Sequence, residues 1–160
     1  MPVSFKSKVP LQQAREAAER LSRLLLAGGL ERVEVAGSVR RGKPEVGDLD
    51  LVVGGDLGRV REAHGVWIWK EGGDKKATID FMGFQVNLLV ASDEEWGAHL
   101  MYFTGPASYN IAYRSRAKKM GMKLNEHGLF DGERRVAGLT EESVYRALGK
   151  KWKPPEQRGT

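Results

Sequence analysis

Two aspartates, Asp48 and Asp50, stand two residues apart where the chain enters an apolar run. Side chains alternate between the two faces of a β-strand, so both carboxylates are expected on the same face. Neighbouring carboxylates repel one another unless a cation lies between them. Hard cations such as Mg²⁺ prefer oxygen ligands and share their coordination shell with substrate phosphates. The pair therefore predicts a site for a metal ion that is bound together with a phosphorylated substrate.

A second polar element, the segment G-S-V-R-R-G at residues 37–42, precedes the aspartates by a few residues. It follows a predicted strand over residues 32–36 and offers backbone N–H groups, the Ser38 hydroxyl and the Arg41 guanidinium, all of which suit an anion. An isolated D-x-D pair more often caps and solvates a strand end. With a phosphate-binding segment beside it, the pair favours phosphoryl or nucleotidyl transfer.

The order G-S-x-R-R-G, four residues, G-D-x-D and then apolar residues resembles the signature of the nucleotidyltransferase superfamily. It is most similar to the signature of the family X (polymerase beta-like) DNA polymerases. Further along, the segment Y-F-T-G at residues 102–105 resembles an element of the same family, and Asn110 and Arg114 follow at the family's spacing. Residues 121–126 resemble its G-x3-N-E element, with His127 where a tyrosine is frequent, and residues 152–158 resemble its closing segment.

The resemblance implies a template-directed DNA polymerase that adds dNTPs to a primer 3′ end, in primer–template or short-gap DNA, with two Mg²⁺ ions for which Mn²⁺ is the alternative. It implies that Asp48 and Asp50 hold the metal ions and that position 87 is the third catalytic position. Nucleotide-binding roles fall on Gly37, Ser38, Arg41, Gly47, Tyr102, Phe103, Gly105 and Asn110. DNA-binding roles fall on Arg114, Lys118, Lys123, Asn125, Glu126 and His127.

Position 87 departs from the family, which has a carboxylate where this chain has Asn87. An amide offers one carbonyl oxygen but no negative charge and no useful basicity. Three explanations are open: a deliberate Asp→Asn substitution that traps an unreacted nucleotide complex, a natural variant in which Asp80 supplies the charge, or a protein that binds nucleotide and DNA but catalyses poorly. If the hairpin loop is Gly83-Phe84, Asp80 lies directly opposite Asn87 on the paired strand.

The spacing of apolar residues predicts alternating helices and strands. A helix begins at Pro10 and ends at Gly28-Gly29, because proline suits the first helical turn and glycine the position after the last. Ser92 and Glu95 form a predicted capping box for a helix that the Y-F-T-G segment interrupts. The other predicted elements are strands over 49–53, 66–70, 77–82 and 85–91, helices over 56–64, 109–120 and 140–148, and a hairpin over 122–135.

By resemblance, the chain is an α+β protein in two parts. Residues 1–91 would form the nucleotidyltransferase palm, a mixed or antiparallel sheet with flanking helices. Residues 92–160 would form a small α+β thumb subdomain that contacts nucleotide and DNA. The lyase and helix-hairpin-helix domains of larger family members have no counterpart ahead of the palm, so we expect a minimal palm-plus-thumb form.

Charge and composition agree with a partner that is a polyanion. The net charge is +5, and residues 109–160 carry twelve Lys/Arg against six Asp/Glu, whereas residues 1–108 carry fourteen against fifteen. A well-solvated helical face would give the same imbalance. The chain has no cysteine, which fits a cytoplasmic protein, with nucleoid or virus association as a variant of that location. We expect a monomer that does not bind membranes.

Two other functions are compatible with parts of the sequence. The D-x-D element also occurs in nucleotidyltransferases that act without a template or on small molecules, although such enzymes have no need of the duplex-reading positions Asn110 and Arg114. Asn87 by itself favours a catalytically silent module that binds DNA or nucleotide.

Overall fold

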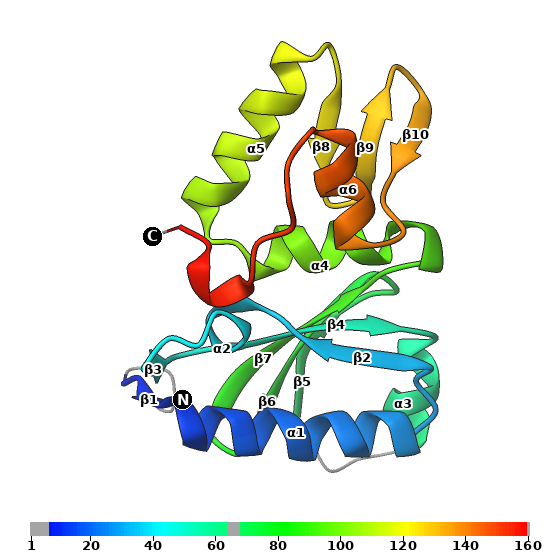
Figure 1. Ribbon diagram of the computed structural model, residues 1–160. Coiled ribbons are helices and arrows are strands. Elements are labelled where there is room, and N and C mark those ends of the chain that lie inside the picture. Colours follow the sequence, from blue (N-terminus) through cyan, green and yellow to red (C-terminus); the bar gives the residue numbers. More distant parts are fainter. Residues whose placement is uncertain (1–6, 64–67, 160) are drawn as a thin grey trace. The chain divides into compact units, whose positions relative to one another are not determined.

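Two hydrophobic cores divide the chain into compact units, residues 1–91 and residues 92–160. The computed structural model, which describes residues 7–63 and 68–159, is shown in Figure 1. Each unit combines helices with a β-sheet, as the predicted α+β class requires. No helix among the described residues is long and apolar enough to cross a lipid bilayer.

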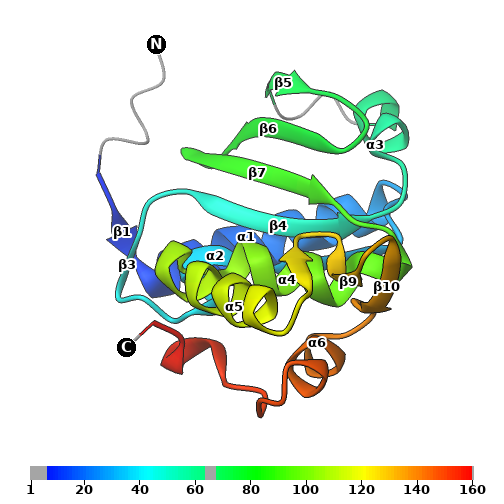
Figure 2. The same ribbon diagram turned by 90° about the horizontal axis from the view of Figure 1, so that it is seen from above.

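The N-terminal unit is built on a five-stranded mixed sheet of order β2-β4-β7-β6-β5. The central strands β4 and β7 run parallel and every other neighbouring pair is antiparallel. Strands β4, β7, β6 and β5 lie side by side in Figure 2. The strands span β2 Arg32–Val35, β4 Leu49–Gly54, β5 Ile68–Gly72, β6 Lys76–Phe81 and β7 Phe84–Val90. The predicted mixed sheet is therefore confirmed, although residues 66 and 67 of one predicted strand lie outside the described residues.

Helix α1 (Leu11–Ala27) begins directly after Pro10 and covers one face of this sheet (Figure 1). Its buried residues recur at helical spacing and pack against strand residues such as Leu49 and Leu51, which have no exposed surface. Two short helices, α2 (Gly37–Arg40) and α3 (Leu57–Ala63), follow β2 and β4. The predicted end of α3 at His64 lies outside the described residues. A two-stranded ribbon of β1 (Val9–Pro10) and β3 (Glu45–Val46) was not predicted.

The β6–β7 hairpin differs from the prediction. Its loop is Met82-Gly83, with φ of 50° and 85°, so Phe81 pairs with Phe84. Positive φ at both loop residues is the type I′ geometry that matches the twist of the strands, and glycine suits its second position. The predicted loop Gly83-Phe84 was therefore wrong by one residue. The partner of each β6 residue moves by two positions, which preserves the facing of every side chain.

The C-terminal unit combines three helices with a three-stranded antiparallel sheet of order β10-β9-β8. In Figure 1, α5 rises beside β8. The predicted hairpin over 122–135 is thus part of a larger sheet, and its last strand extends to Ala137. The elements are the 3₁₀ turn η1 (Asp93–Glu95), α4 (Trp96–Thr104), α5 (Ala107–Lys119), β8 (Lys123–Asn125), β9 (Gly128–Asp131), β10 (Arg134–Ala137), α6 (Glu141–Ala147) and the 3₁₀ turn η2 (Pro155–Gln157).

Helix α4 starts and ends differently from the prediction. The Ser92 hydroxyl donates to the Glu95 carboxylate at 3.0 Å instead of capping a backbone N–H, so the predicted capping box was wrong. The N–H groups of Gly97 and Ala98 instead donate to the carbonyls at residues 138 and 139, at 3.0–3.1 Å. The helix also continues through the Y-F-T-G segment as far as Thr104.

A buried ion pair closes the C-terminal unit. Arg158 donates through Nη1 and Nη2 to the two carboxylate oxygens of Glu141, at 2.9 and 3.0 Å, and through Nε to the Lys153 carbonyl at 2.9 Å. Trp152 Nε1 adds a bond to Glu141 at 2.8 Å. Burial alone opposes the charged form, but the Glu141 carboxylate prevails and raises the pKa of Arg158. The segment after α6 is therefore an integral part of this unit.

Replacing Arg158 should destabilise the C-terminal unit strongly. Arg158→Met keeps the unbranched stem but leaves the Glu141 carboxylate buried without its cation, which typically lowers the free energy of unfolding by about 3–5 kcal/mol. Urea denaturation, monitored by circular dichroism, measures the loss of unfolding free energy. The matched control is Arg134→Met, whose pair with Asp131 is exposed and 3.9 Å long, and we expect a loss below about 1 kcal/mol. Similar losses in the two variants would contradict this role of Arg158.

Candidate active site

Asp48 immediately precedes β4 and Asp50 is the second residue of this strand, on the face opposite the fully buried Leu49. Asp50 pairs with Asn87 in the parallel β4–β7 register, and Asn87 Nδ2 donates to Asp50 Oδ1 at 2.9 Å. Asp48 precedes the strand and is exposed, and Gln85 Nε2 lies 3.4 Å from its Oδ2. The sheet thus brings Asp48, Asp50 and Asn87 together, although 37 residues separate the second from the third.

Asn87 presents its two polar atoms to different neighbours. Its Nδ2 faces Asp50, while its Oδ1 lies 3.4 Å from the Thr78 hydroxyl across the β6–β7 pair. Thr78, and not Asp80, is its direct cross-strand partner, and Asp80 pairs with Gln85. The predicted pairing of Asp80 with Asn87 was wrong because the hairpin loop is one residue earlier. From a diagonal position, about 7–8 Å away, a carboxylate is poorly placed to substitute for a carboxylate at residue 87.

The Asp50 carboxylate is held in an environment that disfavours its charge. Burial raises its pKa, the hydrogen bond from Asn87 opposes this rise, and the negative charge of Asp48 adds to it. The positive charge of Arg41 lowers the pKa of Asp50 in turn. Two carboxylates that repel one another in a partly buried position are a donor set that fits a divalent cation with oxygen ligands.

The turn before the aspartates approaches Asp50 closely. The Ala36 N–H donates to the Asp50 carbonyl at 2.8 Å, and the chain then enters α2 through Gly37 with φ of 60°. A Cβ at residue 37 would collide with the Asp50 carboxylate, and a left-handed φ is strained for other residues. Glycine is therefore required here by both space and backbone conformation. The next residue of this turn is Ser38, which lines the hollow described below.

A hollow of about 440 Å³ opens beside this turn, a volume typical of small-molecule sites. It is lined by Lys8, Ser38, Arg41, Lys43, Pro44, Glu45 and Gly47. Three of these side chains are cationic and one is acidic, so the hollow suits an anion. Sequence reasoning missed Lys8 and Lys43. Lys43 lies within the basic segment and could have been included, whereas Lys8 arrives through the unpredicted pairing of β1 with β3.

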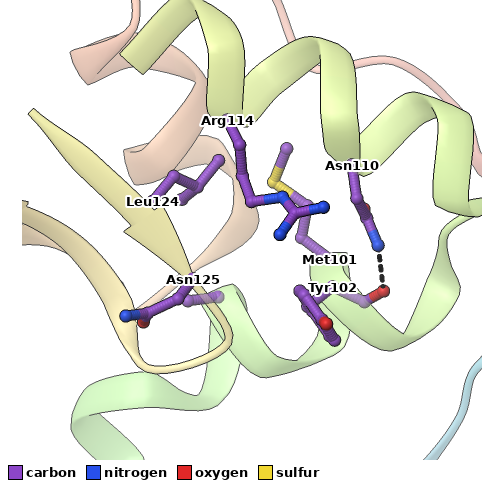
Figure 3. A pocket seen from close by; sticks show the side chains of 7 residues that line it. Met101, Tyr102, Asn110, Arg114, Leu124 and Asn125 are labelled. Carbon is purple, nitrogen blue, oxygen red and sulfur yellow. Dashed lines mark hydrogen bonds between the residues drawn. The ribbon is translucent and has the colours of Figure 1, made fainter. Parts of the chain in front are cut away.

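In the C-terminal unit, Figure 3 shows a second group of predicted residues around one small pocket. The Arg114 side chain reaches from α5 toward Tyr102 on α4 and Asn125 at the end of β8. Asn110 Nδ2 donates to the Tyr102 carbonyl at 2.8 Å, which ties α5 to α4. The pocket measures about 10 Å³, close to the space for one water molecule. Its polar side chains are those of Tyr102, Asn110 and Asn125, which are partly buried, and Arg114, which is exposed.

The other predicted residues of this unit lie in three settings. Phe103 packs edge-on against the Tyr102 ring, with centroids 4.9 Å apart, and Gly105 ends α4 with φ of 61°. Lys118 and Lys123 are exposed and do not line the pocket. Glu126 and His127 form the turn between β8 and β9, where the Glu126 carbonyl lies 2.9 Å from His99 Nδ1.

Known proteins resemble this chain in both sequence and fold. The sequence model of the DNA polymerase beta thumb family matches residues 99–159. The chain is 28% identical over 142 residues to the repair DNA polymerase X of African swine fever virus, an alignment that covers 80% of this chain and 82% of the relative. It is 26% identical over 192 residues to DNA polymerase lambda of Rattus norvegicus, covering 96% of this chain and 33% of the relative.

Among solved structures, a crystal structure of Leishmania infantum polymerase beta, described as a ternary P/T complex, has the same fold. The TM-score is 0.83 at 20% sequence identity, over 98% of this chain and 78% of that chain. This similarity confirms the α+β architecture expected from the sequence.

Removing the Asp50 charge should stabilise the metal-free protein. Because burial raises the pKa of Asp50, the folded protein binds this proton more tightly than the unfolded chain, and the free energy of unfolding falls as pH rises through the raised pKa. Asp50→Asn keeps the shape of the side chain and removes the cost of burying its negative charge. We expect its melting temperature to exceed that of the wild type by a few degrees at neutral pH.

The difference in melting temperature should shrink as the pH approaches the ordinary aspartate pKa of about 4. There Asp50 of the folded wild type is protonated and, like the asparagine of the variant, carries no charge. Thermal unfolding in the presence of a chelator measures both effects. Asp131→Asn, at an exposed position of β9, is the control and should leave the melting temperature unchanged. A lower melting temperature for Asp50→Asn at neutral pH would refute the argument.

Proposed function

Because this chain belongs to the family X DNA polymerases, we propose that it is a template-directed DNA polymerase that adds dNTPs to a primer 3′ end, with short gaps as its substrate. The observation that carries the proposal is the group formed by Asp48, Asp50 and the turn at Gly37, next to a hollow lined by cations. Carboxylates for a metal ion and donors for a phosphate chain are thus adjacent within one unit.

The N-terminal unit would bind the triphosphate. Arg41, Lys8 and Lys43 supply positive charge to the hollow, and the Ser38 hydroxyl and the backbone at Gly47 supply hydrogen-bond donors. Mg²⁺, held by Asp48 and Asp50, would supply neutralisation of the phosphate charge. The primer 3′-oxygen forms a bond to the α-phosphorus while the bond to pyrophosphate breaks, so the work of these residues is to orient the phosphates and balance their charge.

Asn87 would limit the rate of this chemistry. Its Nδ2 donates to Asp50 and so fixes the orientation of that carboxylate, but an amide cannot take the proton of the primer hydroxyl. The protein would therefore bind nucleotide well and react slowly. Among the explanations for Asn87, replacement of the charge by Asp80 has lost its geometric basis, because Thr78 and not Asp80 lies opposite residue 87.

The C-terminal unit would contribute selectivity. Tyr102, Phe103 and Gly105 are proposed to contact the sugar of the nucleotide, and Asn110 and Arg114 the edges of the new base pair. The basic surface that includes Lys118 and Lys123 would contact DNA phosphates, with an affinity that falls as salt concentration rises. Asn125 shares a pocket with Tyr102 and Arg114, which supports a common role for these residues.

Restoring a carboxylate at residue 87 should increase the polymerase rate. Asn87→Asp supplies both a proton acceptor and an anionic ligand next to Asp50, and a positioned acid or base typically contributes about 10²-fold or more. Single-nucleotide incorporation on gapped DNA with Mg²⁺ measures the gain.

Two controls make this result specific. Gln85→Asp places the same charge two residues away on the same face of β7 and should give no comparable gain. Asp50→Asn should abolish incorporation in both backgrounds. If Asn87→Asp incorporates no nucleotide at all, the chain is not a polymerase, and a silent DNA- or nucleotide-binding module becomes the better description.

Replacing Arg114 should weaken templated incorporation selectively. Its loss removes a charged donor proposed to read base-pair edges, a contact worth about 1–3 kcal/mol, so kcat/KM for the correct dNTP in the Asn87→Asp background should fall about 10–100-fold. Incorporation opposite each of the four template bases is the measurement.

The matched control is Lys118→Ala, one turn further along α5, which should weaken DNA binding evenly and reduce its salt dependence. If the protein that retains Arg114 incorporates nucleotides regardless of the template base, a template-independent nucleotidyltransferase is instead favoured.

A further inference from the structure

A second group of potential metal ligands lies entirely within the C-terminal unit. Glu95, His99 and His127 each offer one ligand atom, and these three atoms lie within 4.8 Å of one another. The Glu126 carbonyl accepts the His99 Nδ1 proton at 2.9 Å, and an ion bound at this nitrogen would replace that proton. Glu95 Oε1 is 3.1 Å from His99 Nδ1 and 3.0 Å from His127 Nδ1. Two imidazole rings thus converge on a single carboxylate oxygen. Their ring centroids are 5.9 Å apart and tilted by 51°.

The acidic ligand is oriented by its neighbour. The Ser92 hydroxyl donates to the other carboxylate oxygen, Oε2, at 3.0 Å, which leaves Oε1 directed at the imidazoles. Glu95 ends η1 and caps α4, and His99 lies four residues further on in α4, a spacing that places both side chains on one face of the helix. Hydrogen bonds that fix the ligands of a metal in this way are typical of metal sites in proteins.

The third ligand is fixed by the turn between β8 and β9. The backbone N–H of His127 donates to Asn125 Oδ1 at 2.8 Å, and its carbonyl accepts from Arg135 Nε at 3.0 Å. Arg135 is itself held by Glu94 at 2.8 Å. Both sides of the turn are therefore tied to surrounding side chains. The His127 ring is presented to the helix by a backbone that is already in place.

Burial of the three side chains decreases from the helix toward the turn. The exposed side-chain fraction is 7% for His99, 15% for Glu95 and 54% for His127. An ion at this position would be enclosed by protein on one side and open to water on the other. Three protein ligands with one open position are a common arrangement for Zn²⁺, and two histidines with one glutamate are an established ligand set.

We propose that Glu95, His99 and His127 bind a divalent transition-metal ion of the zinc class, separate from the carboxylates at residues 48 and 50. Imidazole ligands select zinc-like ions, whereas Mg²⁺ selects oxygen-rich sites, so the two kinds of site differ in chemistry. The proposal does not depend on polymerase activity. The competing description is a hydrogen-bond network in which one carboxylate simply accepts from two imidazoles.

A bound ion would link the β8–β9 turn to α4 near the pocket of Figure 3. Asn125 lines that pocket and also holds the His127 backbone, and the Phe103 ring lies 5.1 Å from the His99 ring. Occupancy of the site would therefore stabilise the position of α4, which carries Tyr102 and Phe103. The ion is assigned a positioning role and no chemical step.

Titration of the full chain, without a histidine tag, with Zn²⁺ and separately with Co²⁺ tests the proposal. Excess Mg²⁺ is present throughout to fill oxygen-rich sites. Isothermal titration calorimetry should give one Zn²⁺ per chain, Co²⁺ should produce a visible absorption band, and Zn²⁺ should raise the melting temperature. His127→Gln, at an exposed position that the fold tolerates, should weaken Zn²⁺ binding about tenfold or more.

Asp93→Asn is the matched control, because it removes a nearby exposed carboxylate and leaves Glu95 and the Glu94–Arg135 pair in place, and its affinity for Zn²⁺ should equal that of the wild type. His99→Gln serves as a second variant from the buried side of the site. Equal Zn²⁺ affinity in wild type, His127→Gln and His99→Gln, or no binding by the wild type, would overturn the proposal. The three residues would then form a hydrogen-bond network only.

Discussion

The repulsion between two carboxylates at the start of β4 is the constraint on which the rest of the N-terminal unit depends. Asp50 is partly buried beside Asp48, and both burial and like charge disfavour its ionised form. The surrounding residues reduce this penalty without removing it: Asn87 donates a hydrogen bond and Arg41 contributes a positive charge. A position of this kind is unfavourable for an empty protein and favourable once a cation and a polyanionic ligand share it.

The arrangement of the sheet follows from this constraint. Leu49 and Leu51 alternate with the aspartates and anchor β4 in the core against α1, so the carboxylates cannot rotate inward. The parallel register with β7 sets residue 87 beside Asp50, and the turn at Gly37 places its backbone against the same carboxylate. Residue 87 is therefore held against Asp50 by main-chain pairing, and the turn at Gly37 by a close backbone approach.

Local patterns in the sequence were sufficient to predict the main helices and strands. Periodicity and punctuation by proline and glycine predicted α1, β2, β4, α5 and α6, and the D-x-D spacing predicted the shared face of the aspartates. The hairpin loop was misplaced because Gly83 suits two alternative turns, and only the φ of 50° at Met82 distinguishes them. The β1–β3 ribbon could not be predicted for a different reason. Strands of two residues are too short to show a periodic pattern, so the pairing that brings Lys8 to the hollow has no signal in the sequence.

Contacts between side chains could not be predicted from the sequence where no short motif encodes them. Arg158 and Glu141 are separated by 17 residues and read as ordinary surface charges, yet together they form a buried pair. His99 reads as one more residue of an apolar helix, and its approach to His127 becomes visible only when the β8–β9 turn folds back onto α4. These contacts depend on tertiary packing, which overrides what each residue would do in isolation.

The parallel pairing of β4 with β7 has a consequence for the order of folding. Residues 50 and 87 lie 37 positions apart in the sequence, so a long loop must close before the Asp50 carboxylate acquires Asn87 as its neighbour. Closing such a loop costs conformational entropy that local elements do not face, and folds rich in pairings of this range fold more slowly than folds built from local contacts. During most of the folding reaction the two acids would therefore remain hydrated, and the electrostatic strain of the site would arise only as the central strands join.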